Sequence, residues 1–550
     1  MSAAAAPDAT LAGCRADLAG QAAGQGSGHV AAADERDGEI VFHSAVIVNR
    51  RPRMQNGLTG RSALEGRPGA ARRLTAPSCG VKVTPLSQTI HKVSHFRIAR
   101  TADAMVYNRR NPFMRSQRLA LTFAAVMAAF AGASAHAATE IQFWHSMEGA
   151  LGDRVNGLVE EFNKQNADYQ IKAVYKGNYG ESMNAGIAAF RAGNAPDILQ
   201  VFEVGTATMM YAKGAIKPVQ QMSEEVGDPI DPKQFIGAVA GYYSSPEGKL
   251  VSMPFNSSTV VFYYNKDAFK KAGLDADKPP KTWEELAAVG QKLKAAGQEC
   301  GYTTSWPSWV QLETFSAWHN VPYATKDNGF AGLDARLAVD TPLHVRHLDN
   351  LAKLAKEGIF MYGGRGDEPN SLFISGKCAM ITGSSGLRAN IAKNAKFEFG
   401  TSTLPYYSDV QGAPQNTIIG GASLWVFANK KPETYKGVTK FFKFLASPEI
   451  AARWHQQTGY VPVTKAAYEL TQKQGFYDKN PGTDVGVKQL NVETTAQSRG
   501  LRLGYLPQIR EIEDAEIERI VAGKVPAKDG LQSIVKRGNE LLEKFEKSVK

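Results

Sequence analysis

The sequence predicts an α/β protein with more than one hydrophobic core. Its 550 residues are 43% apolar and 21% charged, which is typical of a globular chain and is long enough for about two to four domains. Strand-like and helix-like apolar patterns alternate along most of the chain, and such alternation produces sheets with helices on their faces. The composition excludes a chain that is disordered throughout, a collagen-like protein, a coiled coil and a polytopic membrane protein.

The first part of this alternation predicts three strands separated by two helices. Residues 139–146 have a strand-like pattern, and apolar residues then recur at helical spacing up to Phe162. Residues 169–176 and 197–203 are expected to form strands, with a helix at 181–192 between them. Such a run makes a parallel sheet, and ligands bind at the carboxyl ends of its strands.

The alternation continues in a second region. Thr282 and Glu285 have the spacing of a capping box, which starts a helix, and Gly297 ends that helix. Further strands are expected at 259–264, 300–306, 378–382 and 418–427, and further helices at 346–356, 432–445, 448–457, 509–522 and 530–547.

The net charge of +11 is not spread evenly along the chain. Residues 1–137 carry 17 of the 64 Lys and Arg residues and 8 of the 53 Asp and Glu residues, which leaves 47 basic and 45 acidic residues for 138–550. The basic excess therefore belongs mostly to the leader, and the folded part is not expected to bind nucleic acid.

A secretory signal peptide is expected at 114–137. Residues 114–118 form a basic segment, the apolar run at 119–131 is too short to cross a bilayer, and 135–137 have the small-x-small pattern of a cleavage site. We therefore expect export and a mature chain that begins near Ala138. Because the 113 residues before the signal would place it inside the chain, the simplest interpretation of that extension is a start codon assigned too far upstream. A disordered N-terminal arm is the alternative.

Two of the four cysteines, Cys300 and Cys378, belong to the expected mature chain. In an oxidising compartment they could form one disulfide, but they could equally be buried free thiols, and the sequence leaves both open. Two cysteines are too few for a disulfide scaffold or a Cys-rich zinc site.

Signatures of common enzymes are absent from the sequence. It has no GxxxxGK[ST] phosphate loop, no GxGxxG after a strand, no GxSxG elbow and no HExxH. His344 and His347 could share a helix face, but without a nearby acidic or Cys partner we expect a solvated surface pair and not a metal site. We expect no catalytic residues, no metal and no cofactor.

Polar, aromatic and glycine residues follow several predicted strands, where ligand contacts concentrate. Each of them alone is ordinary turn or packing chemistry. They are Tyr179 in KGNYGES, Glu203 in QVFEVGTAT, Ser258 in PFNSST, Trp306 in TSWPSW, Ser384 in TGSSG, Gly421 in IIGGAS, Tyr460 in TGYVP and Arg510 in LPQIR.

Together these segments resemble one family, the periplasmic sn-glycerol-3-phosphate-binding proteins of ABC importers, which are maltose-binding-protein-like extracellular solute-binding proteins. The resemblance covers residues 139–547 and is most specific in EVGTATMM, IIGGASLWV and PQIR. It implies the two-lobe periplasmic-binding-protein fold of type II, with mixed sheets flanked by helices and crossover hinge strands between the lobes. The implied lobes are 138–255 with 419–458, and 256–418 with 459–550.

The resemblance also implies a function. A monomeric periplasmic receptor would capture sn-glycerol-3-phosphate, or a related glycerophosphodiester, and deliver it to an inner-membrane ABC permease. The eight residues above match the family's ligand-binding positions. Two alternatives stay open: a periplasmic phosphodiesterase that acts on glycerophosphodiesters, for which the sequence offers neither a metal cluster nor an activated nucleophile, and a sugar-binding protein on the same scaffold.

The charges suggest roles for some of these residues. A phosphate monoester carries about −1.5 to −2 charges and needs hydrogen-bond donors and a cation. Arg510 can offer a bidentate fork, and Tyr179, Tyr460 and Ser258 can add donors. Since a carboxylate would repel the phosphate, we expect Glu203 at the opposite end of the ligand, against the glycerol hydroxyls. We expect Trp306 to cover the carbon chain, Ser384 to bond the glycerol end and Gly421 to allow a close approach of the backbone.

Overall fold

A computed structural model describes residues 32–36, 39–43 and 137–550, and the chain divides into two units, 1–110 and 111–550. In the first unit, β1 (Ala32–Arg36) pairs with β2 (Glu39–His43) as an antiparallel hairpin. The rest of the extension at 1–113, and the expected signal peptide apart from its last residue, lie outside the described residues. In the described part of the chain, no helix is both long and apolar enough to cross a membrane.

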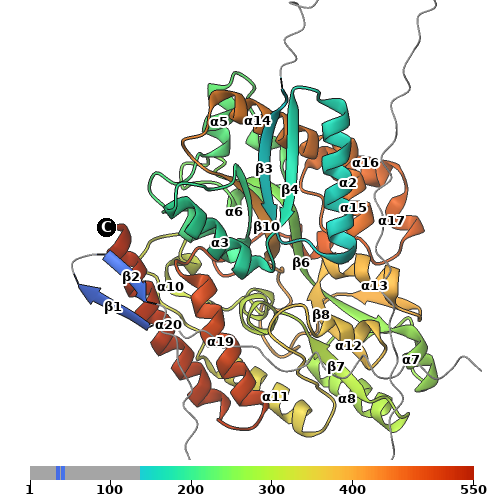
Figure 1. Ribbon diagram of the computed structural model, residues 1–550. Coiled ribbons are helices and arrows are strands. Elements are labelled where there is room, and N and C mark those ends of the chain that lie inside the picture. Colours follow the sequence, from blue (N-terminus) through green and yellow to red (C-terminus); the bar gives the residue numbers. More distant parts are fainter. Residues whose placement is uncertain (1–31, 37–38, 44–136) are drawn as a thin grey trace, which may run out of the picture. The chain divides into compact units, whose positions relative to one another are not determined.

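The second unit begins with the predicted parallel strands. β3 (Thr139–His145) pairs with β4 (Tyr169–Tyr175) on one side and with β5 (Ile198–Phe202) on the other. The helices α2 (Gly149–Gln165) and α3 (Tyr179–Arg191) connect the three strands (Figure 1). The βαβαβ prediction is therefore confirmed.

A long strand continues this sheet into its second half. β10 (Ile419–Val426) pairs antiparallel with β5 and with the first part of β6 (Met253–Asn265), while the second part of β6 pairs with β8 (Cys378–Ser384) and β9 (Phe399–Ser402). β7 (Cys300–Thr304) is parallel to β8, so the order is β4-β3-β5-β10-β6-β8-β7. The sheet is mixed and flanked by helices, as predicted, and β6 passes from one half to the other.

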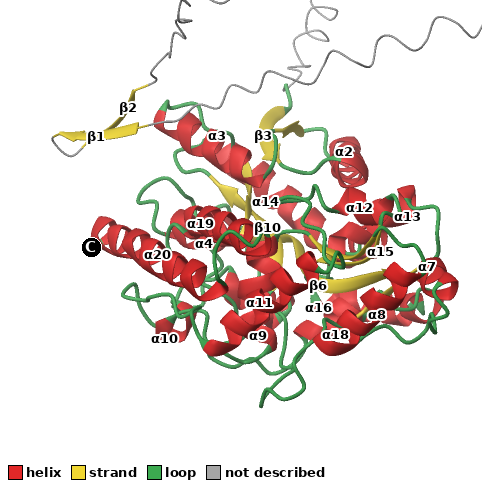
Figure 2. Cartoon of the chain, turned by 90° about the horizontal axis from the view of Figure 1, so that it is seen from below, coloured by secondary structure: helices red, strands yellow, loops and turns green. Residues whose placement is uncertain are grey.

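Two large groups of buried apolar side chains pack against this sheet. One group includes side chains of α2, α14 (Pro432–Ala446) and α15 (Pro448–Thr458). The other includes side chains of α8 (Trp283–Ala295), α11 (Pro342–Lys356), α19 (Leu506–Val521) and α20 (Ala527–Val549), and α20 lies along α19 (Figure 2).

Short elements complete the unit. The helices are α4 (Thr206–Met210), α5 (Val219–Glu225), α6 (Gly237–Tyr242), α7 (Lys266–Lys271), α9 (Phe315–Trp318), α10 (Thr325–Asn328), α12 (Asn370–Ile374), α13 (Arg388–Asn394), α16 (Lys465–Lys473), α17 (Phe476–Lys479) and α18 (Val485–Leu490). Three short 3₁₀-helices are η1 (Glu203–Gly205), η2 (Pro232–Gln234) and η4 (Ser385–Leu387), and η3 (Trp309–Thr314) is a π-helix.

The lobe boundaries implied by the sequence remain a proposal, with one adjustment. Ala467 of α16 packs against Ala451 and Ala452 of α15, and the Ile236 N–H donates to the Val463 carbonyl. These contacts tie α16 to elements of the first lobe. We therefore propose that the segment after residue 459 joins the second lobe only beyond α17.

The helix α8 starts and ends as its sequence predicts. The Glu285 N–H donates to Thr282 Oγ1 (3.1 Å), and the Thr282 N–H donates to Glu285 Oε2 (3.3 Å), which completes the capping box. Gly297 follows the helix with φ of +86°, a conformation that a side chain disfavours.

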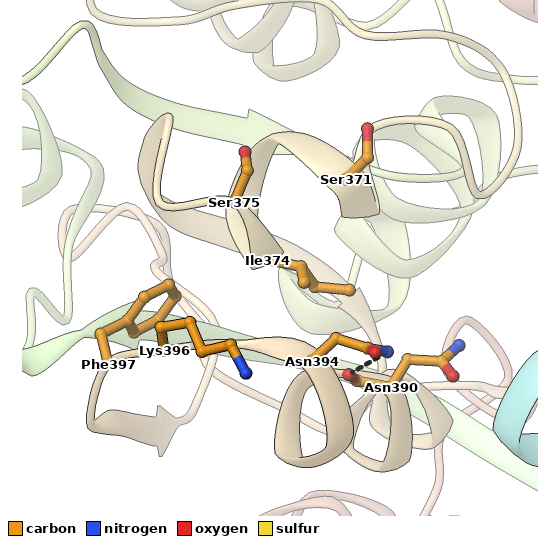
Figure 3. Close-up of a pocket in the computed structure, with 7 residues that line it drawn as sticks. All are labelled: Ser371, Ile374, Ser375, Asn390, Asn394, Lys396 and Phe397. Atoms are coloured by element: carbon orange, nitrogen blue, oxygen red, sulfur yellow. Dashed lines mark hydrogen bonds between the residues drawn. The ribbon is translucent and has the colours of Figure 1, made fainter. Parts of the chain in front are cut away.

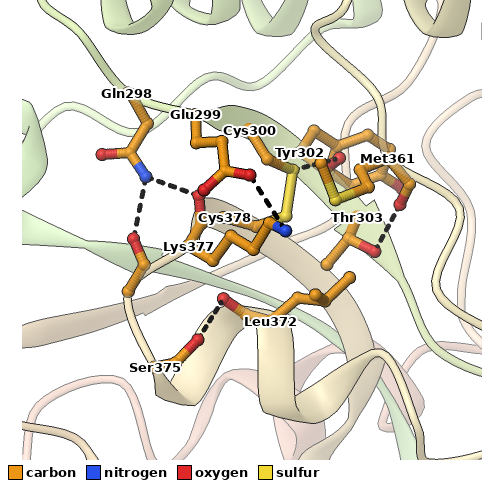
Figure 4. The surroundings of a disulfide bond; sticks show 11 residues. Gln298, Glu299, Cys300, Tyr302, Thr303, Met361, Leu372, Ser375, Lys377 and Cys378 are labelled. Carbon is orange, nitrogen blue, oxygen red and sulfur yellow. Dashed lines mark hydrogen bonds and ion pairs between the residues drawn. A yellow bond between two sulfur atoms is a disulfide. The ribbon is translucent and has the colours of Figure 1, made fainter. Parts of the chain in front are cut away.

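Cys300 and Cys378 form a disulfide, which settles the alternative that the sequence left open (Figure 4). They lie directly opposite each other in the parallel pairing of β7 and β8. A Lys377–Glu299 ion pair of 2.9 Å lies beside the bond. The disulfide therefore joins two neighbouring strands of the sheet across 78 positions of sequence.

The prediction that His344 and His347 form a solvated pair is wrong, because both side chains are fully buried. His347 stacks on Phe315 with ring centroids 3.9 Å apart, and its Nε2 bonds to Gln311 Oε1 (2.9 Å). His344 Nε2 bonds to Ser316 Oγ (2.9 Å). The two histidines share the apolar face of α11, which covers this core. Burial lowers the pKa of His344 to about 3, so both rings act as neutral core groups.

Candidate functional site

Arg510 is the centre of a buried group of charged side chains. It projects from α19 with 6% of its surface exposed. Its Nε and Nη2 donate to the two oxygens of Glu313 at 2.6 and 2.8 Å, and Nη2 also donates to Glu203 Oε1 at 2.6 Å. Burial alone would lower the pKa of Arg510, but the two carboxylates outweigh it and raise this pKa well above its usual value. The guanidinium therefore stays charged.

We expected Glu203 and Arg510 at opposite ends of the ligand, whereas their side chains are in direct contact. Their roles toward a ligand stay predictions. Glu203 comes from the turn η1, immediately after the carboxyl end of β5, and is 5% exposed. Burial raises its pKa, and the charge of Arg510 opposes that rise. In sequence alone, nothing shows that two residues 307 positions apart are ion-paired.

Glu313 also belongs to this group, although it was not among the predicted site residues. It lies in the π-helix η3 and is 1% exposed. π-helical turns are rare and often occur at functional sites. A single acidic residue in the otherwise apolar and neutral segment WVQLETF was the available signal, because a buried carboxylate needs a cationic or donor partner.

Two further carboxyl groups follow Arg510 along α19. Glu513 Oε1 accepts from the Tyr323 hydroxyl (2.6 Å), and Asp514 Oδ1 accepts from the Ser308 N–H (3.1 Å). Burial raises the pKa of Glu513 well above its usual value and that of Asp514 to about 7. The group therefore holds fewer negative charges near neutral pH than its four carboxyl groups could carry.

Neutral hydrogen-bonding side chains form a second group. Asn256 of β6 donates from Nδ2 to the Tyr179 hydroxyl (2.9 Å), and Gln200 donates to Asn256 Oδ1 (2.8 Å). Burial raises the pKa of both Tyr179 and Tyr460, so their hydroxyls keep their protons and can donate. Asn256 stands in the PFNSST segment but was not predicted as a site residue. Its signal was its position beside Ser258 on a strand that is buried throughout.

Gly421 and Ser258 lie on the two strands that join the halves of the sheet. Gly421 has φ of +81°, next to a register shift in the pairing of β10 with β6. A Cβ at this position would lie 1.9 Å from the Asn256 carbonyl oxygen and 3.1 Å from the Ser258 nitrogen. Only glycine fits here. The close approach that we expected toward a ligand is thus already made toward the backbone of β6.

Trp306 and Ser384 occupy the ends of β7 and β8. Trp306 has φ of +51°, which is unusual for a residue with a side chain, and its Nε1 donates to Asp367 Oδ1 (3.1 Å). Its ring centroid is 6.3 Å from that of Tyr179. Ser384 Oγ accepts from the Gly386 N–H (3.1 Å), so this hydroxyl is partly engaged in a turn.

Seven of the eight predicted positions thus fall into two linked sets. Arg510 and Glu203 are in contact, and Tyr179 stacks on Phe202, the neighbour of Glu203, at 5.5 Å. Tyr179 faces Trp306, and Gly421 is paired with the strand that carries Ser258 and Asn256. Ser384 has no recorded contact with the other seven.

A separate cavity of about 620 Å³ lies between α12 and α13 (Figure 3). Ser371 and Ser375 lie on one side of it, and Asn390 and Asn394 on the other. None of the eight predicted ligand residues lines it, so this cavity is not the candidate site.

A strand that continues between two halves of a sheet, with polar side chains gathered where the halves meet, is consistent with a solute-binding protein. Comparison with known proteins agrees. Residues 157–483 match the family model described as bacterial extracellular solute-binding protein, and the chain belongs to that family.

Similar curated proteins carry a more specific name. The chain is 53% identical over 442 residues to the sn-glycerol-3-phosphate-binding periplasmic protein UgpB of Pectobacterium atrosepticum, an alignment that covers 80% of this chain and 99% of the relative. It is 56% identical over 420 residues to UgpB of Escherichia coli strain 536, which covers 76% of this chain and 96% of the relative.

Solved structures show the same fold at lower identity. The UgpB structure from Mycobacterium tuberculosis in complex with glycerophosphocholine aligns with a TM-score of 0.63 at 23% identity, over 74% of this chain and 99% of that one. The cyclic α-maltosyl-1,6-maltose binding protein from Arthrobacter globiformis aligns with a TM-score of 0.59 at 22% identity, over 74% and 100%. The predicted type II solute-binding fold is confirmed.

Proposed function

We propose that this protein is the periplasmic receptor of an ABC importer, that it captures sn-glycerol-3-phosphate or a related glycerophosphodiester, and that it passes the ligand to an inner-membrane permease. The relatives at 53 and 56% identity, whose names state this ligand and compartment, support the proposal. They are solute-binding proteins, and we propose that this chain is likewise a receptor and not an enzyme.

The proposed binding geometry rests on the direct contact between Glu203 and Arg510 (2.6 Å). A carboxylate beside a guanidinium offers one acceptor and one donor, which suits two vicinal hydroxyls. A phosphate at the same place would meet the charges of both Glu203 and Glu313. We therefore place the glycerol diol at this charged group.

We therefore place the phosphate at the second, neutral group of side chains. Tyr179, Tyr460, Ser258 and the Gly421 N–H are donors that carry no opposing charge. Tyr179 is also the first residue of α3, and the N-terminal end of a helix favours an anion. Trp306 would cover the carbon chain between the two groups, and Ser384 would add a hydroxyl at the same edge of the sheet.

Ligand binding would close the two lobes. In the proposed division, Glu203 belongs to the first lobe and Arg510 to the second, so a diol held by both stabilises only the closed arrangement. The permease would then recognise that arrangement.

Calorimetric titration of the purified protein with sn-glycerol-3-phosphate, glycerophosphocholine and maltose tests this proposal, with product analysis after incubation. We expect saturable binding of at least one glycerol phosphate, no binding of maltose and no product. Binding of maltose alone, or release of glycerol-3-phosphate from the diester, would contradict it.

A further inference from the structure

Arg502 lies outside the candidate site and has no role in the function proposed so far. Its Nη2 donates to three backbone carbonyl oxygens at the end of α6, those of Gly241 (3.1 Å), Tyr242 (3.1 Å) and Ser244 (3.0 Å). Among the described residues, no carboxylate forms an ion pair with Arg502, and burial lowers its pKa. The positive charge is therefore held by the carbonyl groups at the end of a helix, which favour a cation.

This contact joins the two large groups of buried apolar side chains. Leu501 and Leu503, the neighbours of Arg502, belong to the group that includes side chains of α19 and α20. Tyr242 belongs to the other group, with side chains of α14 and α15. In the proposed division, α6 lies in the first lobe and Arg502 in the second, so the guanidinium reaches from one lobe to the other.

The surfaces around Arg502 fit closely. The guanidinium carbon of Arg502 lies 4.4 Å from the centroid of the Phe330 ring, and that ring meets Tyr242 edge-on with centroids 6.3 Å apart. A Cβ at Gly500 would lie 2.8 Å from an atom of the Tyr242 ring. The chain before Arg502 therefore packs against α6 without room for a side chain at position 500.

Tyr242 links this contact to the candidate site but leaves Arg502 outside it. The Tyr242 hydroxyl donates to the backbone carbonyl of Glu203 (3.2 Å), whereas the carboxylate of Glu203 is bonded to Arg510. The described hydrogen bonds of the Arg502 side chain go to backbone carbonyls and to none of the eight predicted ligand residues. Arg502 and Arg510 both hold the first lobe, and only Arg510 does so at the candidate site.

We propose that Arg502 is a positioning residue that stabilises the closed arrangement of the two lobes and so strengthens ligand binding without touching the ligand. This inference rests on the proposed function, in which a ligand binds to both lobes. A contact that is made only when the lobes are closed favours closure, and every ligand that requires closure gains the same factor in affinity. Because the lobes have to open before the ligand leaves, the contact acts mainly on the dissociation rate.

The substitution Arg502→Met tests the inference, since Met keeps an apolar side chain beside Phe330 and removes the hydrogen bonds to α6. Three ligands are titrated by calorimetry: sn-glycerol-3-phosphate, glycerophosphocholine and n-propyl phosphate. We expect each to bind about tenfold more weakly, because a charged hydrogen bond is lost, with losses within about threefold of one another. Stopped-flow measurements should assign most of the loss to faster dissociation.

Arg499→Met is the matched control. The guanidinium carbon of Arg499 also lies 4.4 Å from the Phe330 ring centroid, but its ion pair with Asp327 (3.2 Å) stays within the proposed second lobe. This variant should change every affinity less than about threefold. Misfolding does not imitate the expected result, because a misfolded fraction lowers the binding stoichiometry, whereas loss of the contact lowers the affinity at unchanged stoichiometry.

Unchanged or tighter binding in Arg502→Met would overturn the inference, since the contact would then not favour the closed arrangement. A loss confined to the two ligands with a glycerol diol would also overturn it, because the effect would then pass through Tyr242 to Glu203. If the unsubstituted protein binds neither sn-glycerol-3-phosphate nor glycerophosphocholine, the proposed function itself fails.

Discussion

The two groups of the candidate site differ in how their polar atoms are satisfied. Around Arg510, every identified donor contact goes to a carboxylate of the protein itself, at 2.6 to 2.8 Å. Around Tyr179, the side chains are neutral, and Asn256 donates to the Tyr179 hydroxyl. The comparison teaches that a buried arginine is not automatically a phosphate anchor, because its charge can already be compensated. Substitutions in each group test this distinction.

Arg510→Ala should have the largest effect. Removing one partner of a buried ion pair costs about 3–5 kcal/mol, because Glu203 and Glu313 are left buried without a cation. We expect such a loss in the free energy of unfolding in urea, and binding of sn-glycerol-3-phosphate weaker by about two decades or more. Arg510→Lys is the control that retains a charge. An unchanged affinity in Arg510→Ala would remove the charged group from the site.

Asp514→Asn should change how stability depends on pH. The folded-state pKa of Asp514 is about 7, above its value in the unfolded chain, so the folded protein holds a proton that the unfolded chain releases. This contribution is present below about pH 4 and is lost as the pH rises toward 7, by up to ~1.4 kcal/mol per pH unit. Urea unfolding at pH 5 and 7 should show a shallower decline in the variant. Equal slopes would mean that Asp514 titrates normally.

Glu203→Gln separates the diol from the phosphate. We expect binding of sn-glycerol-3-phosphate to weaken about tenfold, since a charged hydrogen bond to the diol is replaced by a neutral one. n-Propyl phosphate, which lacks both hydroxyls, should bind the variant and the unsubstituted protein within threefold of each other. A comparable loss for both ligands in calorimetry would place Glu203 elsewhere in the site.

Tyr179→Phe, a substitution in the neutral group, should have the smallest effect on ligand affinity. Loss of one neutral hydrogen bond costs about 0.5–1.5 kcal/mol, so both sn-glycerol-3-phosphate and n-propyl phosphate should bind about three- to tenfold more weakly. The stacking on Phe202 is retained. If only the ligand with hydroxyls lost affinity, Tyr179 would belong to the diol end.

Much of the fold followed from local patterns. The capping box of Thr282 and Glu285, the Gly297 stop and the first three strands depend on neighbours within a few positions, and the structure has them where the sequence predicts them. The short strand β9 was not predicted, because four residues carry too weak an alternation. His344 was misjudged because sequence alone does not show which face of α11 is covered.

The candidate site could be predicted residue by residue but not as an arrangement. The eight positions came from a family resemblance, and the contact between Glu203 and Arg510 depends on how distant elements pack. The same is true of Glu313, which is 197 positions from its arginine, and of the closeness of Gly421 to Asn256. Such partners are set by tertiary packing, which one sequence does not contain.

A crystal structure of the protein grown with sn-glycerol-3-phosphate would show which of the two groups binds the phosphate. We expect phosphate oxygens within hydrogen-bonding distance of the Tyr179 hydroxyl and the Gly421 N–H, and a glycerol hydroxyl between Glu203 and Arg510. A phosphate bonded to Arg510, with the hydroxyls against Tyr179, would overturn the proposed binding geometry.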